Sequence, residues 1–225
     1  DLAQIDADRR KSLFFRALLP MVLAENERLA EQRERLMNAL EANTPTPRHR
    51  IVLSRLAEAF GVEGDPLDVE TQAELRAAVN EVPVALALAQ AAKESGWGTS
   101  RFAIEGNNLF GQWTWEPSQG LKPKDRAEGA THYVRVFESL RHSVRSYMHN
   151  LNSHEAYAEF RALRAEAHAE GERLSPELMT TGLDRYSERG QAYVDEVQAM
   201  IHNNRLQWLV VGAQLVRDSG RLAGQ

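Results

Sequence analysis

The residues with the clearest capacity for chemistry lie between positions 85 and 111. A stretch of small apolar residues ends in a single acidic residue, Glu94, and a Gly-Trp-Gly turn follows at 96–98. An Asn-Asn-Leu-Phe-Gly loop comes soon afterwards, at 107–111. This order predicts a carboxyl group on a rigid helix end, beside an aromatic wall and at the mouth of a groove. A carboxyl group in such a place is suited to act as an acid on a sugar chain.

Two features favour the uncharged form of Glu94 that acid catalysis requires. A glycosidic bond breaks when its leaving oxygen is protonated, so the acid has to hold its proton near neutral pH. The negative end of the helix dipole disfavours a second negative charge, and the flanking Ala91, Ala92 and Trp97 offer little solvation. The plain alternative is an exposed glutamate without a role. The glycines on both sides of Trp97 favour the functional interpretation, because they let backbone and ring approach a ligand closely.

A second carboxylate is harder to assign. A retaining or an inverting mechanism needs one at about 5–9.5 Å from the acid. Glu116 follows an aromatic Trp-Thr-Trp segment at a predicted hairpin tip, and Glu128 lies just before the second predicted strand. Either is expected to face Glu94, with Glu116 preferred, and either also fits a plain surface charge. The N-acetyl group of the sugar is a third candidate nucleophile, and it requires no second protein carboxylate.

Aromatic and amide side chains near Glu94, and one tyrosine in a later turn, are candidates for binding the sugar. Sugar rings stack their C–H faces on aromatic rings, and a tyrosine hydroxyl orients an N-acetyl group. Asparagine side chains bind sugar amides or fix loops by bonding to the backbone. For each aromatic residue, packing in the core is the competing interpretation. The predicted substrate-binding residues are Trp97, Asn107, Asn108, Phe110, Trp113 and Tyr186.

The composition is that of an ordinary globular protein and argues against several kinds of chemistry. Of the 225 residues, 43% are apolar and 26% charged, and the net charge of −5 gives no support for nucleic-acid binding. There is no cysteine for a disulfide or a thiolate, and the seven histidines form no metal-binding motif, so we expect no metal and no cofactor. No apolar run reaches the ~18 residues of a membrane helix. Because the chain begins with Asp1, we expect a signal peptide or anchor to lie outside it.

The hydrophobic pattern predicts mainly helices with one small β-lobe. Residues 8–43 carry apolar side chains at helical spacing, and Pro20 is expected to kink or break that helix. Residues 97–130 read as an irregular loop region, in which 110–115 has a strand pattern that pairs with a second one at 131–137. The expected helix-boundary residues are Asp68, Gly96, Ser139 and Ser175.

These motifs resemble the bacterial peptidoglycan N-acetylglucosaminidases of glycoside hydrolase family 73, and within that family the Bax-type branch. A segment at 14–20 resembles the helical extension of this branch, so the resemblance spans most of the chain. The other matching motifs are Ala89–Gly98, Asn107–Gly111, Val134–Ser139, Tyr147–Tyr157 and Leu183–Tyr193.

The resemblance implies a mainly α, lysozyme-like α+β fold with a small β-hairpin lobe and an N-terminal helical extension. It implies that Glu94 is the general acid, that Tyr186 lies in the groove and that the second acid belongs to the β-lobe. It also implies the periplasm or cell envelope of a Gram-negative bacterium. The expected divisions are an extension at 1–80, a glucosaminidase domain at 81–205 and a tail at 206–225 that packs on the body.

The preferred hypothesis is an endo-β-N-acetylglucosaminidase that cleaves the β-1,4 bond after N-acetylglucosamine in peptidoglycan. A lytic transglycosylase is the nearest alternative, because those enzymes also present Glu-Ser at a helix end and need one acid. Their usual Gly-Leu-Met-Gln continuation is replaced here by Asn-Leu-Phe-Gly. A non-catalytic glycan-binding or scaffolding module is the second class, with the charged helix at 25–35 as a face for a protein partner. A purely structural helical protein comes third, and the oligomeric state stays open.

Overall fold

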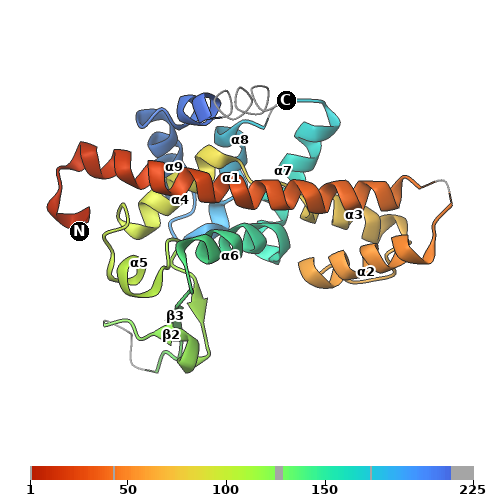
Figure 1. Cartoon of the computed structure of the whole chain (residues 1–225), viewed down its shortest axis with the longest axis horizontal. Helices are drawn as coiled ribbons and strands as arrows, with labels where there is room; N and C mark the ends of the chain where they lie inside the picture. Colours follow the sequence, from red (N-terminus) through yellow and green to blue (C-terminus); the bar gives the residue numbers. More distant parts are fainter. Residues whose placement is uncertain (1, 43, 125–128, 173, 214–225) are drawn as a thin grey trace, which may run out of the picture. The chain divides into compact units, whose positions relative to one another are not determined.

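The computed structural model describes residues 2–42, 44–124, 129–172 and 174–213, and this part of the chain is mainly helical (Figure 1). Single 3₁₀ turns occur at Leu2–Gln4, Pro117–Gln119, Glu155–Tyr157 and Asp184–Tyr186, and residues 206–213 are helical as well. The mainly α architecture with a small β-lobe is confirmed. The α-helices are α1 (Ala7–Leu40), α2 (Pro47–Phe60), α3 (Val69–Ala78), α4 (Val84–Ser95), α5 (Arg101–Gly106), α6 (Leu140–Ser153), α7 (Ala158–Ala169), α8 (Pro176–Thr181) and α9 (Gln191–Asn203).

The β-lobe is a three-stranded antiparallel sheet with the strand order β1-β3-β2. Strand β1 (Trp113–Thr114) pairs with β3 (Tyr133–Arg135), as the sequence predicts, and β2 (Gly120–Leu121) pairs with the other edge of β3. Strand β2 was not predicted, because two residues carry no alternating pattern. Glycine is required at 120, since a Cβ atom there would lie 2.5 Å from the Cβ atom of Tyr133.

The first helix continues through Pro20, so the expected break at this residue is wrong. A proline inside a helix removes one backbone hydrogen bond and clashes with the preceding turn, which costs ~3 kcal/mol or more. Around it, Leu18, Leu19 and Val22 are only 2%, 9% and 0% exposed. Burial of such side chains contributes about 1.5–3 kcal/mol each. Packing of the buried face therefore outweighs the cost, and Pro20 itself points to solvent.

The region predicted as irregular, 97–130, contains the short helix α5, which is a second correction. Ser100 caps its first turn, with its hydroxyl accepting a hydrogen bond from the Ala103 backbone N–H at 3.2 Å. Asn107 ends it in the left-handed conformation, with φ of 51°, and its N–H donates to the Phe102 carbonyl. Ser at the N-cap and Asn after the last turn are ordinary helix signals. They were missed because the surrounding glycines and aromatics read as a loop.

The chain forms two compact units, each assembled from segments that are distant in the sequence. The first comprises the residues up to Val22, Val84–Val144 and the residues from Asp195 onward. The second comprises Leu23–Pro83 and Arg145–Val194. The divisions expected from the sequence are continuous stretches of chain, and they stay a prediction: 1–80, 81–205 and 206–225.

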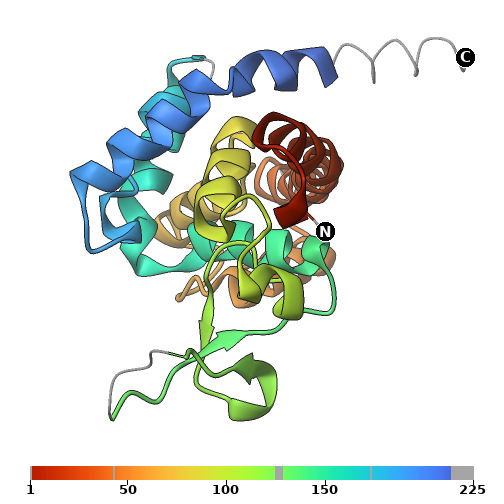
Figure 2. The same cartoon turned by 90° about the vertical axis from the view of Figure 1, so that its left-hand side faces the viewer.

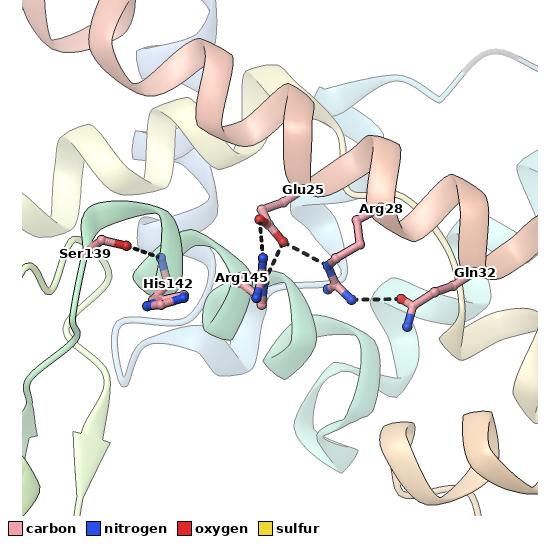
Figure 3. A network of polar contacts seen from close by, with 6 residues as sticks. All are labelled: Glu25, Arg28, Gln32, Ser139, His142 and Arg145. Atoms are coloured by element: carbon pink, nitrogen blue, oxygen red, sulfur yellow. Dashed lines mark hydrogen bonds and ion pairs between the residues drawn. The ribbon is translucent and has the colours of Figure 1, made fainter.

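A buried carboxylate in the second unit is neutralised by two arginines (Figure 3). The Glu25 side chain is 0% exposed, and its Oε2 accepts from Arg28 Nε and Arg145 Nε, both at 2.9 Å. Arg145 Nη2 also donates to Oε1 at 3.0 Å, and this hydrogen bonding raises the pKa of Arg145. A buried charge is tolerated only when it is paired in this way. The pairing therefore holds the second half of α1 to α6 within this unit.

Buried polar contacts in the same unit fix the segment 79–83 that leads into α4. The fully buried Arg164 donates to the carbonyls of Ala77 at 2.7 Å and Glu81 at 2.6 Å. Burial lowers the pKa of Arg164 to about 9. Asn26 exchanges two hydrogen bonds with the backbone of Val82, at 2.7 and 3.0 Å. Backbone carbonyls at the end of α3 and in the segment after it thereby receive hydrogen-bond donors.

Candidate active site

Glu94 lies near the end of a helix that is deeply buried over most of its length. The eight residues 85–92 of α4 are each no more than 2% exposed, and all except the buried Gln90 have small or apolar side chains that fill the core of the first unit. Glu94 is half-buried, next to the last residue of the helix. This half-buried residue is therefore carried by a closely packed helix.

The turn after Glu94 contains three consecutive residues in the left-handed conformation. The φ angles of Gly96, Trp97 and Gly98 are 56°, 61° and 76°. Glycine adopts this conformation freely, whereas Trp97 does so at a cost of roughly 1–2 kcal/mol. The Trp97 N–H donates to the Ala92 carbonyl at 2.9 Å, which closes the end of α4 as expected from Gly96. The sequence Gly-Trp-Gly thus ends the helix directly beside Glu94.

Ser95 latches this turn to the helix. It is 0% exposed, its hydroxyl donates to the Ala91 carbonyl at 2.6 Å, and the same oxygen accepts from the Gly98 N–H at 2.8 Å. The Ser100 N–H also donates to the Ser95 carbonyl at 2.9 Å. The residue next to Glu94 is therefore fixed on both sides. Sequence reasoning missed this role, because a serine next to a helix end is ordinary on its own.

The Trp97 ring packs against the beginning of α1, which Figure 2 shows beside α4. Phe15 and Phe14 contact it edge-on, with ring centroids 5.3 and 6.1 Å away and interplanar angles of 74°. The Lys11 ammonium nitrogen lies 5.3 Å from the centroid of the Trp97 ring. Trp97 was predicted to stack on a sugar, and the structure shows it as a half-buried ring with protein neighbours.

The Asn-Asn-Leu-Phe-Gly loop is held together by its own asparagines. Asn108 is 1% exposed, and its amide nitrogen donates to the carbonyls of Gln112 and Arg135 at 2.9 and 2.8 Å. Its oxygen accepts from the backbone N–H groups of Phe110 and Gln112, which uses its full hydrogen-bonding capacity. Asn107 donates to the Phe137 carbonyl at 2.9 Å, and Phe110 is 3% exposed. The loop-fixing interpretation thus describes both asparagines here, and Phe110 belongs to the core.

The β-lobe presents two exposed tryptophans. Trp113 is 57% and Trp115 69% exposed, and His132 stacks on Trp113 with centroids 4.2 Å apart and the rings 19° from parallel. Glu116 is exposed in the same lobe, where its Oε1 accepts from the Ser118 hydroxyl at 3.0 Å. The other candidate acid, Glu128, lies outside the described residues.

Tyr186 belongs to the second compact unit, whereas the other described candidates belong to the first. Its ring stacks on Tyr193, with centroids 5.3 Å apart and the planes 12° from parallel, and Tyr157 lies tilted at 5.8 Å. Tyr186 itself is half-buried. The three rings therefore form one aromatic cluster, in which a tyrosine ring is held rigidly.

An ion pair fixes the last turn of α4 from another side. The Lys93 ammonium group pairs with the Glu196 carboxylate of α9. Sequence reasoning did not find this contact, because its partners are separated by 103 positions. The contacts of Lys93 and Ser95 thus hold the residues on both sides of Glu94.

The described residues contain neither a cluster of metal-binding side chains nor a membrane-spanning helix. No three His, Asp or Glu side chains of this part of the chain come together as a metal site would require. None of its helices has the length and apolar character needed to cross a bilayer.

Residues 70–206 match the model of the glucosaminidase family, described as mannosyl-glycoprotein endo-β-N-acetylglucosaminidase. The chain is 30% identical over 199 residues to Protein bax of Escherichia coli (strain K12), which covers 87% of this chain and 70% of that protein. No solved structure is significantly similar. The matched region contains Glu94, the turn after it and the whole β-lobe.

Proposed function

We propose a specific reaction for this chain, which belongs to the Bax-type branch of the glucosaminidase family of glycoside hydrolases. The proposed reaction is cleavage of the β-1,4 bond after N-acetylglucosamine in peptidoglycan. Membership of this family supports a glycosidase that acts on the cell wall. The bond that is cleaved and the residues that cleave it are part of the proposal. The envelope, where peptidoglycan lies, is the proposed location.

The observation that carries the proposal is the position of Glu94, a half-buried acidic residue in the last turn of the closely packed helix α4. In the proposed reaction Glu94 protonates the oxygen that leaves the anomeric carbon. Water supplies the hydroxyl group that takes its place on that carbon, and the proton released from water restores the acid. A fixed acid acts best when it is held in one geometry, because orientation is then not lost before each turnover.

The β-lobe is the proposed source of further contacts to the glycan. Trp113 offers an exposed indole backed by His132, and such a flat apolar ring suits the C–H face of a sugar. Glu116 is the preferred second carboxylate, and Glu128 and the substrate N-acetyl group stay as the alternatives. Tyr186 is proposed to orient an N-acetyl group.

Digestion of purified sacculi by Glu94→Gln tests the proposal. We expect the variant to release no soluble fragments while its circular dichroism spectrum and urea midpoint match the wild type. Glu105→Gln is the matched control, because it makes the same change at an exposed carboxylate of α5 and is expected to keep full activity. Activity of Glu94→Gln at the wild-type level would refute the assignment.

The products decide between the enzyme classes. Mass spectrometry of wild-type digests is expected to show N-acetylglucosamine at the new reducing ends. Anhydro-muramyl ends would instead identify a lytic transglycosylase, which also uses one acid. Binding to sacculi without any released fragments would identify a non-catalytic module. Loss of activity in Glu116→Gln or Glu128→Gln would identify the second carboxylate, and activity in both would favour participation of the N-acetyl group.

A further inference from the structure

We propose that Phe14 and Phe15 of α1, acting through Trp97, position Glu94 for catalysis. Glu94 has the role proposed above, so this inference rests on that function. The first 22 residues belong to the same compact unit as α4, and they contact the turn that follows Glu94. The beginning of α1 is thus proposed to support the turn beside the catalytic acid.

The first argument is the conformation of Trp97. A tryptophan with φ of 61° is strained, and such a residue persists only when its surroundings hold it. Two edge-on ring contacts, from Phe14 and Phe15, supply this support. Aromatic pairs of this geometry stabilise a ring beyond its burial, and here they offset the cost of the left-handed conformation.

The second argument is how closely the extension approaches the backbone of the turn. A Cβ atom added to Gly98 would lie 3.2 Å from Leu2 Cδ1 and 3.2 Å from Phe14 Cδ2. The first residues of the chain therefore rest directly on the turn at Gly98. Glycine is favoured at 98 by its φ of +76°, and a Cβ atom there would in addition press on these two side chains.

The third argument connects the turn to Glu94. Trp97 donates to the Ala92 carbonyl, and Gly98 donates to the Ser95 hydroxyl. These hydrogen bonds join the turn to the residues on both sides of Glu94, so a shift of the Trp97 ring shifts the end of α4. Errors of about 1 Å in the position of a catalytic group can reduce the rate by about 100-fold.

Phe14 and Phe15 do not themselves contact a glycan, because they are only 5% and 7% exposed. Trp97 has these rings at its side and Lys11 near its ring centre. The geometry therefore assigns Trp97 a positioning role in place of the sugar stacking predicted from the sequence. The two roles differ in kinetics, because a lost sugar contact raises KM, whereas a misplaced acid lowers kcat.

The test compares Phe15→Leu and Trp97→Leu with Phe60→Leu, using soluble glycan strands as the substrate. Phe60 is a matched control, since it is 3% exposed, stacks on His149 and belongs to the second unit. We expect kcat to fall about ten- to a hundredfold in the first two variants, with KM within about twofold of the wild type. Phe60→Leu is expected to keep the wild-type kcat at a temperature where all variants are folded. Trp97→Phe, which keeps an aromatic edge, is expected to recover part of kcat.

Fluorescence gives a readout that is independent of turnover. Trp113, Trp115 and Trp208 are 57%, 69% and 76% exposed, so the half-buried Trp97 is the best protected of the four tryptophans. Phe15→Leu is expected to increase acrylamide quenching, and Phe60→Leu is not. A wild-type kcat in Phe15→Leu, or a raised KM with unchanged kcat in Trp97→Leu, would overturn the inference. The Glu94→Gln variant distinguishes failure of the proposed function from failure of this inference. If Glu94→Gln is active, the proposed function is refuted. If Glu94→Gln is inactive and Phe15→Leu is unimpaired, only the positioning role of Phe14 and Phe15 is refuted.

Discussion

Replacing Ser95 by alanine removes the hydroxyl that ties the turn after Glu94 to α4. The hydroxyl donates to the Ala91 carbonyl at 2.6 Å and accepts from the Gly98 N–H at 2.8 Å, inside a residue that is 0% exposed. In the variant the Ala91 carbonyl oxygen loses one hydrogen-bond donor. The partly buried Gly98 N–H loses the hydroxyl oxygen that accepts its hydrogen bond. The change therefore tests how much the latch contributes to the stability of the turn.

The expected cost follows from the donor that is left unsatisfied. A buried polar group without a partner costs about 1–3 kcal/mol. The lost bond to the Ala91 carbonyl adds little, because a carbonyl oxygen is adequately satisfied by a single hydrogen bond. We therefore expect Ser95→Ala to lower the free energy of unfolding by about 1–3 kcal/mol. For a chain of this size that corresponds to a fall in Tm of about 2–4 °C per kcal/mol.

Urea unfolding followed by far-ultraviolet circular dichroism measures this difference. Thr99→Ala is the control, because its hydroxyl donates to the Gly96 carbonyl at 2.6 Å in the same turn but in contact with solvent. We expect less than about 1 kcal/mol for the control, since an exposed group can bond to water instead. Equal stabilities of Ser95→Ala and the wild type, within the error of the midpoints, would refute the latch.

Three further predictions have defined outcomes. Gly98→Ala and Gly111→Ala both place alanine at positive φ, but only at Gly98 would the new Cβ atom lie within 4 Å of other protein atoms. Thermal unfolding should therefore show Gly98→Ala as the less stable variant by about 1–3 kcal/mol. Equal losses of stability in the two variants would contradict the contact of Gly98 with the extension. Trp113→Ala is expected to weaken sacculus binding in pull-down assays without changing the urea midpoint, and unchanged binding would remove Trp113 from the site. Burial lowers the pKa of Arg164 to about 9, so above that pH the unfolded chain binds more protons than the native chain. The stability of the wild type relative to Arg164→Met should then rise by up to about 1.4 kcal/mol per pH unit, and a flat difference between pH 8 and 10.5 in urea titrations would contradict this.

Features set by neighbouring residues could be predicted from the sequence. Gly96 ends α4, Ser139 caps α6 through the His142 N–H at 3.2 Å, and Ser175 caps α8. The pairing of β1 with β3 follows from two alternating segments. Each of these signals lies within a few residues of its effect, because caps, stops and strand patterns act through local hydrogen bonds.

Features that depend on distant packing could not be predicted in the same way. The helix through Pro20 survives because of the burial of its flanking residues, and that burial depends on the whole fold. Periodicity marks Phe15 as buried but not its partner, Trp97, which lies 82 positions away. For Glu94 the chemistry was readable from the turn beside it, whereas the supports of that turn were not.

The first helix bears on how this protein can be divided for expression. A fragment limited to the family match, 70–206, retains Glu94 but lacks Phe14 and Phe15. Water would then reach the Trp97 ring and the apolar surface beneath it, and such uncovered patches promote aggregation. Grafting this hydrolase onto another scaffold thus means transplanting its opening helix as well.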